Sequence, residues 1–292
     1  MQVERVGVVG AGQMGNGIAH VLALAEYDVL MTDISADALS AAMALIDKNM
    51  TRQVSKGAIS EAQRAIALGR IKTTQTLSDL GQTDLVIEAA TERETIKQAI
   101  FEDLLPHLKP TTILTSNTSS ISITRLASRT DRPEKFMGFH FMNPVPVMQL
   151  VELIRGIATD DETFSACYAV VERIGKTAAT AEDFPAFIVN RILMPMINEA
   201  IYTLYEGVGS VRCRHHRLAE RAAHPTGCGV STVPDTELTA AGVQCRRFHC
   251  ELCGCAGDDS PSEWYSVGRW LVVCTQCVDR TAVCPPPEDV CG

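Results

Sequence analysis

Residues Arg5–Gly15 (RVGVVGAGQMG) form an apolar run that passes directly into a glycine-rich turn. The valines of the run are typical of a parallel strand covered on both faces, and apolar residues at helical spacing in 16–25 predict a helix after the turn. In a Gly-x-Gly-x-x-Gly turn, Gly10 permits the tight turn, Gly12 lets a pyrophosphate approach the backbone, and Gly15 lets the helix pack closely on the strand. Free N–H groups at the start of such a helix attract phosphate. The segment therefore predicts a dinucleotide site whose turn consists of Gly10, Ala11, Gly12, Gln13, Met14 and Gly15.

A second predicted strand, 28–33, follows at the length of one strand–helix–strand crossover and ends at Asp33. A carboxylate at this position accepts hydrogen bonds from the adenine ribose and repels a 2′-phosphate, so it favours NAD over NADP. The two segments together predict an α/β fold of the Rossmann type, with a doubly wound, mostly parallel sheet. An ordinary strand–turn–helix without a cofactor is the alternative.

The stretch 34–69 is longer than one crossover helix requires, and it predicts an insert of two helices. Ser60 and Gln63 form a candidate capping box at the start of the second helix. Basic side chains recur at helical spacing along the first helix, at Lys48, Arg52 and Lys56. These three side chains could form a site for a phosphate-rich ligand, or they could simply be a solvated helix face.

Polar side chains follow the next predicted strands, which lie at 70–73, 84–90 and 112–115. Glu92 and Lys97 come after the second of these strands, and the run Ser116–Ser120 (SNTSS) comes after the third. Because ligands bind beside the carboxyl ends of the strands in doubly wound folds, we expect these side chains to line the ligand site. A polar loop without a ligand is the alternative.

Two apolar runs joined by a proline-bounded turn stand at 135–154 and predict a β-hairpin. If the turn is centred on Pro146, His140 faces Glu152 across the ladder, and each is the sole ionisable group of its run. A carboxylate beside an imidazole fixes the tautomer and stabilises the imidazolium, so the ring can take a proton from an alcohol. The pair predicts a general acid–base, and a histidine satisfied within the core is the alternative.

A further helix is predicted from the segment that opens at Pro185 and runs on to Tyr205, after a helix around 164–174 and a short strand near 177–181. Asn190 is a polar residue early in this otherwise apolar helix. Because a buried amide needs hydrogen-bond partners, we expect Asn190 to face the active site.

Charge and hydropathy exclude several classes of protein. The net charge of −9 argues against a nucleic-acid-binding surface. The sequence contains neither a basic start followed by an apolar run nor eighteen consecutive apolar residues, so we expect no membrane span and a cytoplasmic location.

The motifs described above occur together and in a fixed order: the glycine turn, Asp33, the Ser116–Ser120 run, Gly138–Pro144 (GFHFMNP) and Phe187–Arg191 (FIVNR). Together they resemble the L-3-hydroxyacyl-CoA dehydrogenase family, in particular its stand-alone bacterial 3-hydroxybutyryl-CoA members, over about residues 3–210. The resemblance implies NAD-dependent oxidation of a (3S)-3-hydroxyacyl-CoA to a 3-oxoacyl-CoA. The His-Phe-x-Asn-Pro element is far more specific than the glycine turn.

The resemblance also implies roles for single residues. His140 would be the catalytic base and Glu152 its partner, while Ser119 and Asn190 would bind the 3-oxygen and thioester region of the substrate. The side chains that would lie along the cofactor are Glu92, Lys97 and Asn143, and Lys56 would bind a phosphate of coenzyme A.

The sequence departs from the family after Ser210. Family members continue into a helical domain that forms a homodimer, and that domain is not recognisable here. Residues 211–292 contain ten of the eleven cysteines and no Lys, Ile, Met or Asn. We therefore expect a Rossmann domain at 1–184, the first helix of the helical domain at 185–210, and a poorly ordered, frameshifted tail at 211–292.

Two alternatives to an intact dehydrogenase remain. Cys250, Cys253, Cys274 and Cys277 match the spacing of paired C-x2-C zinc ligands, so the tail could be a zinc module fused to a dehydrogenase. A Rossmann domain does not guarantee chemistry, so the chain could instead be a non-catalytic nucleotide-binding protein.

Overall fold

The computed structural model describes residues 2–208, 264–266 and 272–274. The chain divides into two compact units, Met1–Ile192 and Leu193–Gly292. In the second unit, β9 (Trp264–Ser266) and β10 (Val272–Cys274) pair antiparallel. Apart from β9 and β10, the tail expected to be poorly ordered and frameshifted lies outside the described residues. Of the four cysteines of the zinc alternative, Cys250, Cys253 and Cys277 also lie outside them, and Cys274 is the last residue of β10. The domain boundaries at 184 and 210 stay predictions.

Eight strands of the described chain form one sheet in the first unit, in the order β3-β2-β1-β4-β5-β6-β7-β8. Neighbours are parallel except β6 and β7, which are antiparallel, so β7 and β8 run against the other six. The strands are β1 (Arg5–Val9), β2 (Asp28–Thr32), β3 (Ile71–Thr74), β4 (Leu85–Glu88), β5 (Ile113–Ser116), β6 (Phe136–Phe141), β7 (Leu150–Arg155) and β8 (Thr177–Glu182). The predicted doubly wound, mostly parallel sheet is confirmed.

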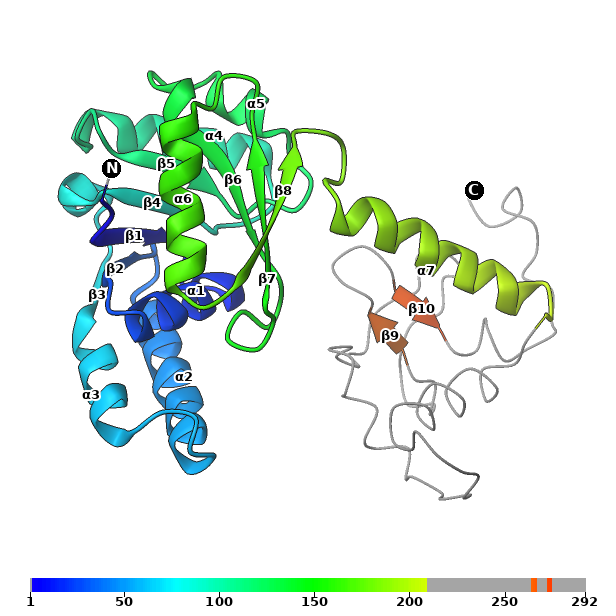
Figure 1. Ribbon diagram of the computed structural model, residues 1–292, viewed down its shortest axis with the longest axis horizontal. Helices are drawn as coiled ribbons and strands as arrows, with labels where there is room; N and C mark the ends of the chain where they lie inside the picture. Colours follow the sequence, from blue (N-terminus) through cyan, green and yellow to red (C-terminus); the bar gives the residue numbers. More distant parts are fainter. Residues whose placement is uncertain (1, 209–263, 267–271, 275–292) are drawn as a thin grey trace. The chain divides into compact units, whose positions relative to one another are not determined.

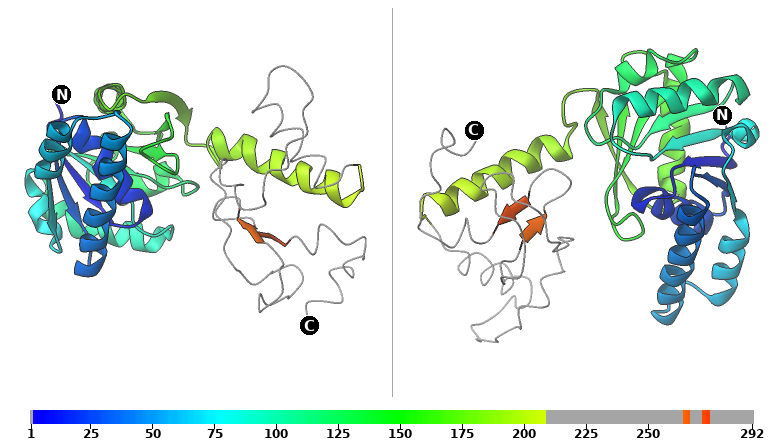
Figure 2. Two further views of the ribbon diagram at one scale, coloured as in Figure 1. Left: turned by 90° about the horizontal axis from the view of Figure 1, so that it is seen from below. Right: turned by 180° about the vertical axis from the view of Figure 1, so that it is seen from behind.

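Helices cover both faces of this sheet, as Figures 1 and 2 show. Successive strand residues point to opposite faces, so Ile87 joins one core cluster and Val86 the other. The first cluster packs against α1 (Gln13–Leu24), α2 (Ala36–Ser55), α3 (Glu61–Arg70) and α6 (Asp161–Arg173). The second packs against α4 (Glu94–Leu104), α5 (Ile123–Ala127) and the 3-10 turn η1 (Leu77–Gln82). The described residues also form the 3-10 turns η2 (Leu105–His107) and η3 (Pro133–Lys135).

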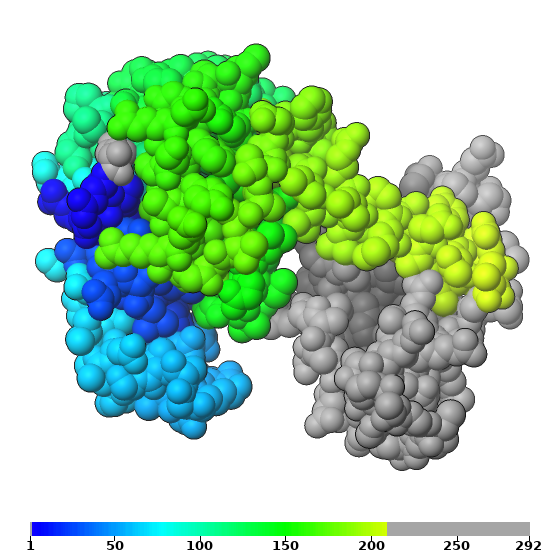
Figure 3. All heavy atoms as spheres, viewed as in Figure 1, coloured from blue at the N-terminus to red at the C-terminus, as the bar shows by residue number. Residues whose placement is uncertain are grey.

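The predicted two-helix insert is the pair α2 and α3, which Figure 3 shows projecting from the body of the first unit in blue to cyan. The capping box is present: Ser60 Oγ accepts from the Gln63 N–H, and the Gln63 side chain accepts from the Ser60 N–H. The basic side chains Lys48, Arg52 and Lys56 are exposed on this insert.

The last described helix, α7 (Val189–Tyr205), begins in the first unit. Among the described residues, no helix is long and apolar enough to cross a membrane.

Asp183 fastens the end of β8 to the start of α5. Its carboxylate accepts from Ser122 Oγ at 2.7 Å, from the Ile123 N–H at 2.9 Å and from the Thr124 N–H at 2.8 Å. Burial alone would raise the pKa of Asp183, but these hydrogen bonds, with that of Thr124 foremost, outweigh it and hold the pKa below its usual range.

Replacing Asp183 by Asn leaves one acceptor oxygen for three donors, so we expect a loss of about 1–2 kcal/mol in the free energy of unfolding at pH 7. Because the folded-state pKa is lowered, the carboxylate contributes its stability above the unfolded pKa of about 3.9 and loses it as the pH falls through the folded value. Urea unfolding followed by circular dichroism should therefore show the gap between wild type and Asp183→Asn closing below about pH 4. The exposed Asp103→Asn serves as the control, and a gap that stays constant in acid would contradict the assignment.

Candidate active site

His140 and Glu152 lie opposite each other on the antiparallel strands β6 and β7, in the predicted register. His140 Nδ1 is 2.7 Å from Glu152 Oε2. His140 stands near the carboxyl end of β6, and Glu152 near the start of β7. Because β7 runs against β6, the start of one strand and the end of the other meet at the same rim of the sheet.

Glu152 is completely buried, and both of its oxygens are used. Oε1 accepts from the N–H groups of Ile188 at 2.9 Å and Val189 at 2.8 Å, at the start of α7. Burial alone would raise the pKa of Glu152, but the hydrogen bonds from His140 and from the Val189 N–H outweigh it, so the pKa is lowered. An ionised carboxylate can only accept, so His140 Nδ1 must carry the proton and donate it.

This tautomer leaves Nε2 of a neutral His140 as the proton acceptor. Nε2 makes no hydrogen bond to any described residue, and the side chain keeps 9% of its surface exposed. The ring of Phe187 lies 6.0 Å from the imidazole, centroid to centroid. The imidazole is thus oriented by a carboxylate at Nδ1, and its Nε2 is free to accept a proton.

Asn190 and Ser119 are brought to the same place. Asn190 Nδ2 donates to the main-chain oxygen of Ser119 at 3.1 Å, which joins the start of α7 to the loop after β5. Glu152 holds the same end of α7 through Ile188 and Val189. The structure therefore gathers His140, Glu152, Ser119 and Asn190 around the first turn of α7, although they come from four separate segments.

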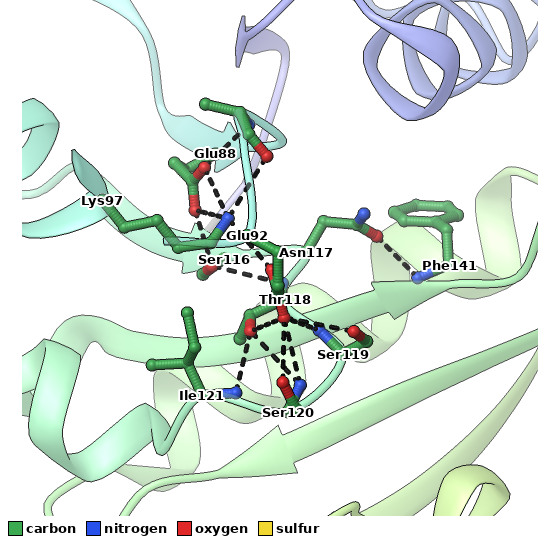
Figure 4. Close-up of polar contacts among 11 residues, drawn as sticks. Glu88, Glu92, Lys97, Ser116, Asn117, Thr118, Ser119, Ser120, Ile121 and Phe141 are labelled. Atoms are coloured by element: carbon green, nitrogen blue, oxygen red, sulfur yellow. Dashed lines mark hydrogen bonds and ion pairs between the residues drawn. The ribbon is translucent and has the colours of Figure 1, made fainter. Parts of the chain in front are cut away.

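Glu92 and Lys97 lie beside the loop after β5, as Figure 4 shows. Glu92 Oε1 accepts from Thr118 Oγ1 at 2.6 Å and from the Ser119 N–H at 2.8 Å. Lys97 is 1% exposed, and its ammonium contacts Glu88 at 2.8 Å and Glu92 at 3.5 Å. Lys97 thus takes part in a buried ion-pair network, and its expected place along the cofactor stays a prediction.

Three neighbours of the site had no individual role in the sequence-based prediction: Glu88, Asn117 and Phe187. Asn117 Oδ1 accepts from the Phe141 N–H at 2.8 Å and so ties the loop after β5 to the end of β6. Glu88 is the only ionisable residue of β4, an otherwise apolar strand, and that contrast is the signal that could have singled it out.

The glycine turn lies at the carboxyl end of β1. Gly10 has φ +103°, and a Cβ on Gly15 would overlap the carbonyl oxygen of Gly10. A Cβ on Gly12 would meet nothing within 4 Å, so a ligand can approach the main chain of the turn at this position. No side chain caps the start of α1, which leaves its N–H groups for a ligand. This surface fits the pyrophosphate of a dinucleotide.

Asp33 stands beside this turn, after β2. Its Oδ2 accepts from the Ala11 N–H at 2.8 Å, and its Oδ1 accepts from the Ser35 N–H at 3.0 Å. Asn143 is exposed just beyond β6, near His140 in the chain. Lys56 is exposed at the end of α2, on the helical insert. It makes no hydrogen bond or ion pair with His140, Glu152, Ser119 or Asn190.

Comparisons with known proteins agree with this geometry. Residues 5–184 match the family model described as 3-hydroxyacyl-CoA dehydrogenase, NAD binding domain. A 3-hydroxybutyryl-CoA dehydrogenase of Bradyrhizobium diazoefficiens is 60% identical over 225 residues, which cover 77% of each chain. A 3-hydroxyadipyl-CoA dehydrogenase of Escherichia coli is 39% identical over 78% of this chain and 48% of its own.

A solved structure is similar as well. The crystal structure of (S)-3-hydroxybutyryl-CoA dehydrogenase from Ralstonia eutropha aligns with a TM-score of 0.73 and 45% identity, over 77% of this chain and 79% of that chain. The fold and the matched motifs define an NAD-binding dehydrogenase domain. The chain belongs to the 3-hydroxyacyl-CoA dehydrogenase family.

The glycine turn yields a prediction that separates folding from cofactor binding. Gly12→Ala places its methyl group in open space, so we expect it to cost at most about 1 kcal/mol of stability as an N-cap change. The same methyl group would occupy the approach to the backbone, so the Kd for NADH should rise by at least about tenfold, equivalent to about 1.4 kcal/mol.

Gly15→Ala should instead reduce the stability of the protein first and its NADH affinity as a consequence, because its methyl group meets the Gly10 carbonyl and disrupts the turn itself. Thermal unfolding and NADH fluorescence titration of the two variants measure both quantities. Unchanged NADH affinity in a folded Gly12→Ala protein would rule out the turn as the pyrophosphate site.

Proposed function

We propose that this chain oxidises short (3S)-3-hydroxyacyl-CoA thioesters, of the 3-hydroxybutyryl-CoA type, to 3-oxoacyl-CoA with NAD⁺. The observation that carries the proposal is the His140–Glu152 pair, with Nδ1 held at 2.7 Å and Nε2 left as the base. The proposal is supported by membership of the family and by a 60% identical relative named 3-hydroxybutyryl-CoA dehydrogenase.

The proton is handled by His140. Nε2 takes it from the 3-hydroxyl, and the buried Glu152 carboxylate stabilises the imidazolium that results. Bound NAD⁺ would supply the acceptor for the hydride of carbon 3. In the reverse direction, the imidazolium returns the proton to the 3-oxygen as the carbonyl is reduced.

The remaining residues bind and orient. Ser119 and Asn190 would hold the 3-oxygen and the thioester region. Asn190 lies in the first turn of α7, where Glu152 also binds, and its side chain contacts Ser119 of the loop after β5. Asp33 and the glycine turn would bind the adenosine and pyrophosphate, with Glu92, Lys97 and Asn143 further along the cofactor. Lys56, on the exposed insert, would pair with a phosphate of coenzyme A.

His140→Gln tests the chemical step. The amide cannot take up a proton, so acetoacetyl-CoA reduction should fall by about 10²–10⁴, the usual weight of a general acid–base. NADH affinity should stay nearly unchanged, because the ring is bound to Glu152 and not to the glycine turn. His107→Gln, at an exposed position in η2, is the matched control.

The same assay separates the proposed activity from the alternative. Turnover in His140→Gln comparable to that of wild type would remove His140 from the mechanism. Binding of NADH by the wild type without turnover of acetoacetyl-CoA would instead favour a non-catalytic nucleotide-binding protein.

Cofactor preference tests Asp33. We expect higher catalytic efficiency with NADH than with NADPH, because the carboxylate repels a 2′-phosphate. Asp33→Ser should narrow the gap, and Asp33→Asn, which removes the charge but keeps an acceptor for the Ala11 N–H, separates repulsion from loss of the turn contact. Equal or better efficiency of the wild type with NADPH would refute the role of Asp33.

A further inference from the structure

The turn between β6 and β7 consists of residues 142–149 and has few hydrogen bonds of its own. Its two internal main-chain bonds among the described residues both end on the carbonyl oxygen of Pro144, which accepts from the N–H groups of Val147 and Met148 at 3.0 Å. Proline, which has no N–H to donate, occupies two of the positions in the turn. The 142–149 turn therefore depends on contacts from outside for its conformation.

Lys176 supplies two of these contacts. Its Nζ donates to the main-chain oxygens of Val145 at 2.7 Å and Met148 at 2.6 Å. Gly175, with φ +69°, follows the end of α6 in the left-handed conformation that glycine favours and directs the chain into β8. The main chain at Lys176 is thus fixed between a helix and a strand, so the ammonium extends to the turn from a well-defined position.

The ammonium of Lys176 has no opposite charge beside it. Its side chain is half-buried, and among the described residues no carboxylate forms an ion pair with it. Burial accordingly lowers the pKa of Lys176. Neutral carbonyl oxygens offset only part of the cost of withdrawing the charge from water, and a lysine can usually keep its ammonium in the solvent. The two contacts therefore point to a requirement on the position of the turn.

The 142–149 turn packs on α1, the helix that follows the glycine turn, as Figure 1 shows. Val145 is 2% exposed, and a Cβ on Gly17 would lie 2.8 Å from the Val145 Cβ. Side chains do not approach each other this closely, so Val145 requires a bare main chain at Gly17. Gly17 lies two residues beyond Gly15, so this contact fixes the turn beside the part of α1 that is expected to bind pyrophosphate.

Asn143 belongs to the same turn. It precedes Val145 by two residues and follows His140 by three, and it is exposed. In the proposed function, Asn143 lies along the cofactor. His140 is held separately, because its Nδ1 is bound to Glu152 within the sheet. A displaced turn would therefore move Asn143 and the contact with α1 but leave the base in place.

We propose that Lys176 is a positioning residue for cofactor binding and hydride transfer: by binding the carbonyl groups of Val145 and Met148, it holds the 142–149 turn and α1 in the arrangement that receives the cofactor. The proposal deepens the function proposed above and rests on it. In this role Lys176 acts through the main chain of the turn and touches neither substrate nor cofactor.

Lys176→Met tests the proposal, because methionine has a similar length but cannot donate. We expect the Kd for NADH to rise about 3- to 10-fold, since a loosened turn must be ordered again when the cofactor binds. The kcat for acetoacetyl-CoA reduction should fall by about tenfold or more, because small misplacements of reacting groups are costly. The KM for acetoacetyl-CoA should stay within about twofold, because Ser119 and Asn190 lie on other segments.

Arg173→Met is the matched control. Arg173 stands three residues before Lys176 and also donates to two main-chain oxygens, those of Ala25 at 3.0 Å and Glu26 at 3.3 Å, which follow the far end of α1. We expect both variants to lower the melting temperature, but Arg173→Met to keep the NADH Kd and the kcat of the wild type. A loss of stability alone would affect the two variants alike, whereas the proposed role separates them.

Gly17→Ala separates the turn from α1 without changing Lys176. Alanine is a better helix former than glycine, but its methyl group would meet Val145. The Kd for NADH should therefore rise as it does in Lys176→Met. When the two changes are combined, the rise should be smaller than the product of the single effects, because both changes release the same contact.

A wild-type NADH Kd and kcat in a folded Lys176→Met protein would overturn the proposal, as would effects of the same size in Arg173→Met or fully independent effects in the double variant. A crystal structure of Lys176→Met without cofactor gives a readout that needs no turnover: Val145 should be displaced from Gly17, and wild-type packing there would contradict the proposal. Absence of acetoacetyl-CoA turnover in the wild type would instead contradict the proposed function, and the NADH Kd values and the crystal structure would still test the role of Lys176.

Discussion

The carboxylate of Glu152 is the point on which the candidate active site depends. One oxygen orients His140, and the other accepts the first N–H groups of the chain that enters α7. A single buried charge thus fixes the tautomer of the base and brings Asn190 to the loop that carries Ser119. Because β7 runs against β6, this carboxylate reaches the rim from the start of its strand, whereas other ligand-side residues follow the ends of parallel strands.

Local rules predicted the register of the hairpin and the capping box of the insert. A turn centred on Pro146 and the period-2 alternation of strands leave only one partner for His140, and the structure has that partner. The capping box is a contact between residues three apart, so it too can be read from the sequence. Contacts of this kind depend on few other parts of the chain.

The network around Lys97 could not be predicted in the same way. Family resemblance implied that Lys97 lies along the cofactor, but it did not indicate that the ammonium pairs with the buried carboxylate of Glu88. That contact depends on the neighbouring order of β4 and β5 and on which face of α4 packs against the sheet. For Asn190, the sequence indicated a need for partners but not that one of them is the main-chain oxygen of Ser119. Every residue has a main-chain carbonyl oxygen, so an acceptor of this kind cannot be recognised from the residue type.

Asp33 has a consequence for how cofactor choice could evolve. The carboxylate expected to read the ribose also accepts the Ala11 N–H inside the glycine turn. Discrimination between dinucleotides and the shape of the pyrophosphate loop are therefore coupled through one side chain. A descendant that exchanged NAD for its phosphorylated counterpart would need a compensating acceptor for the Ala11 amide, supplied before or together with the change at position 33. Such a change of cofactor would require two substitutions together, because a change at position 33 alone would leave the Ala11 N–H without its acceptor.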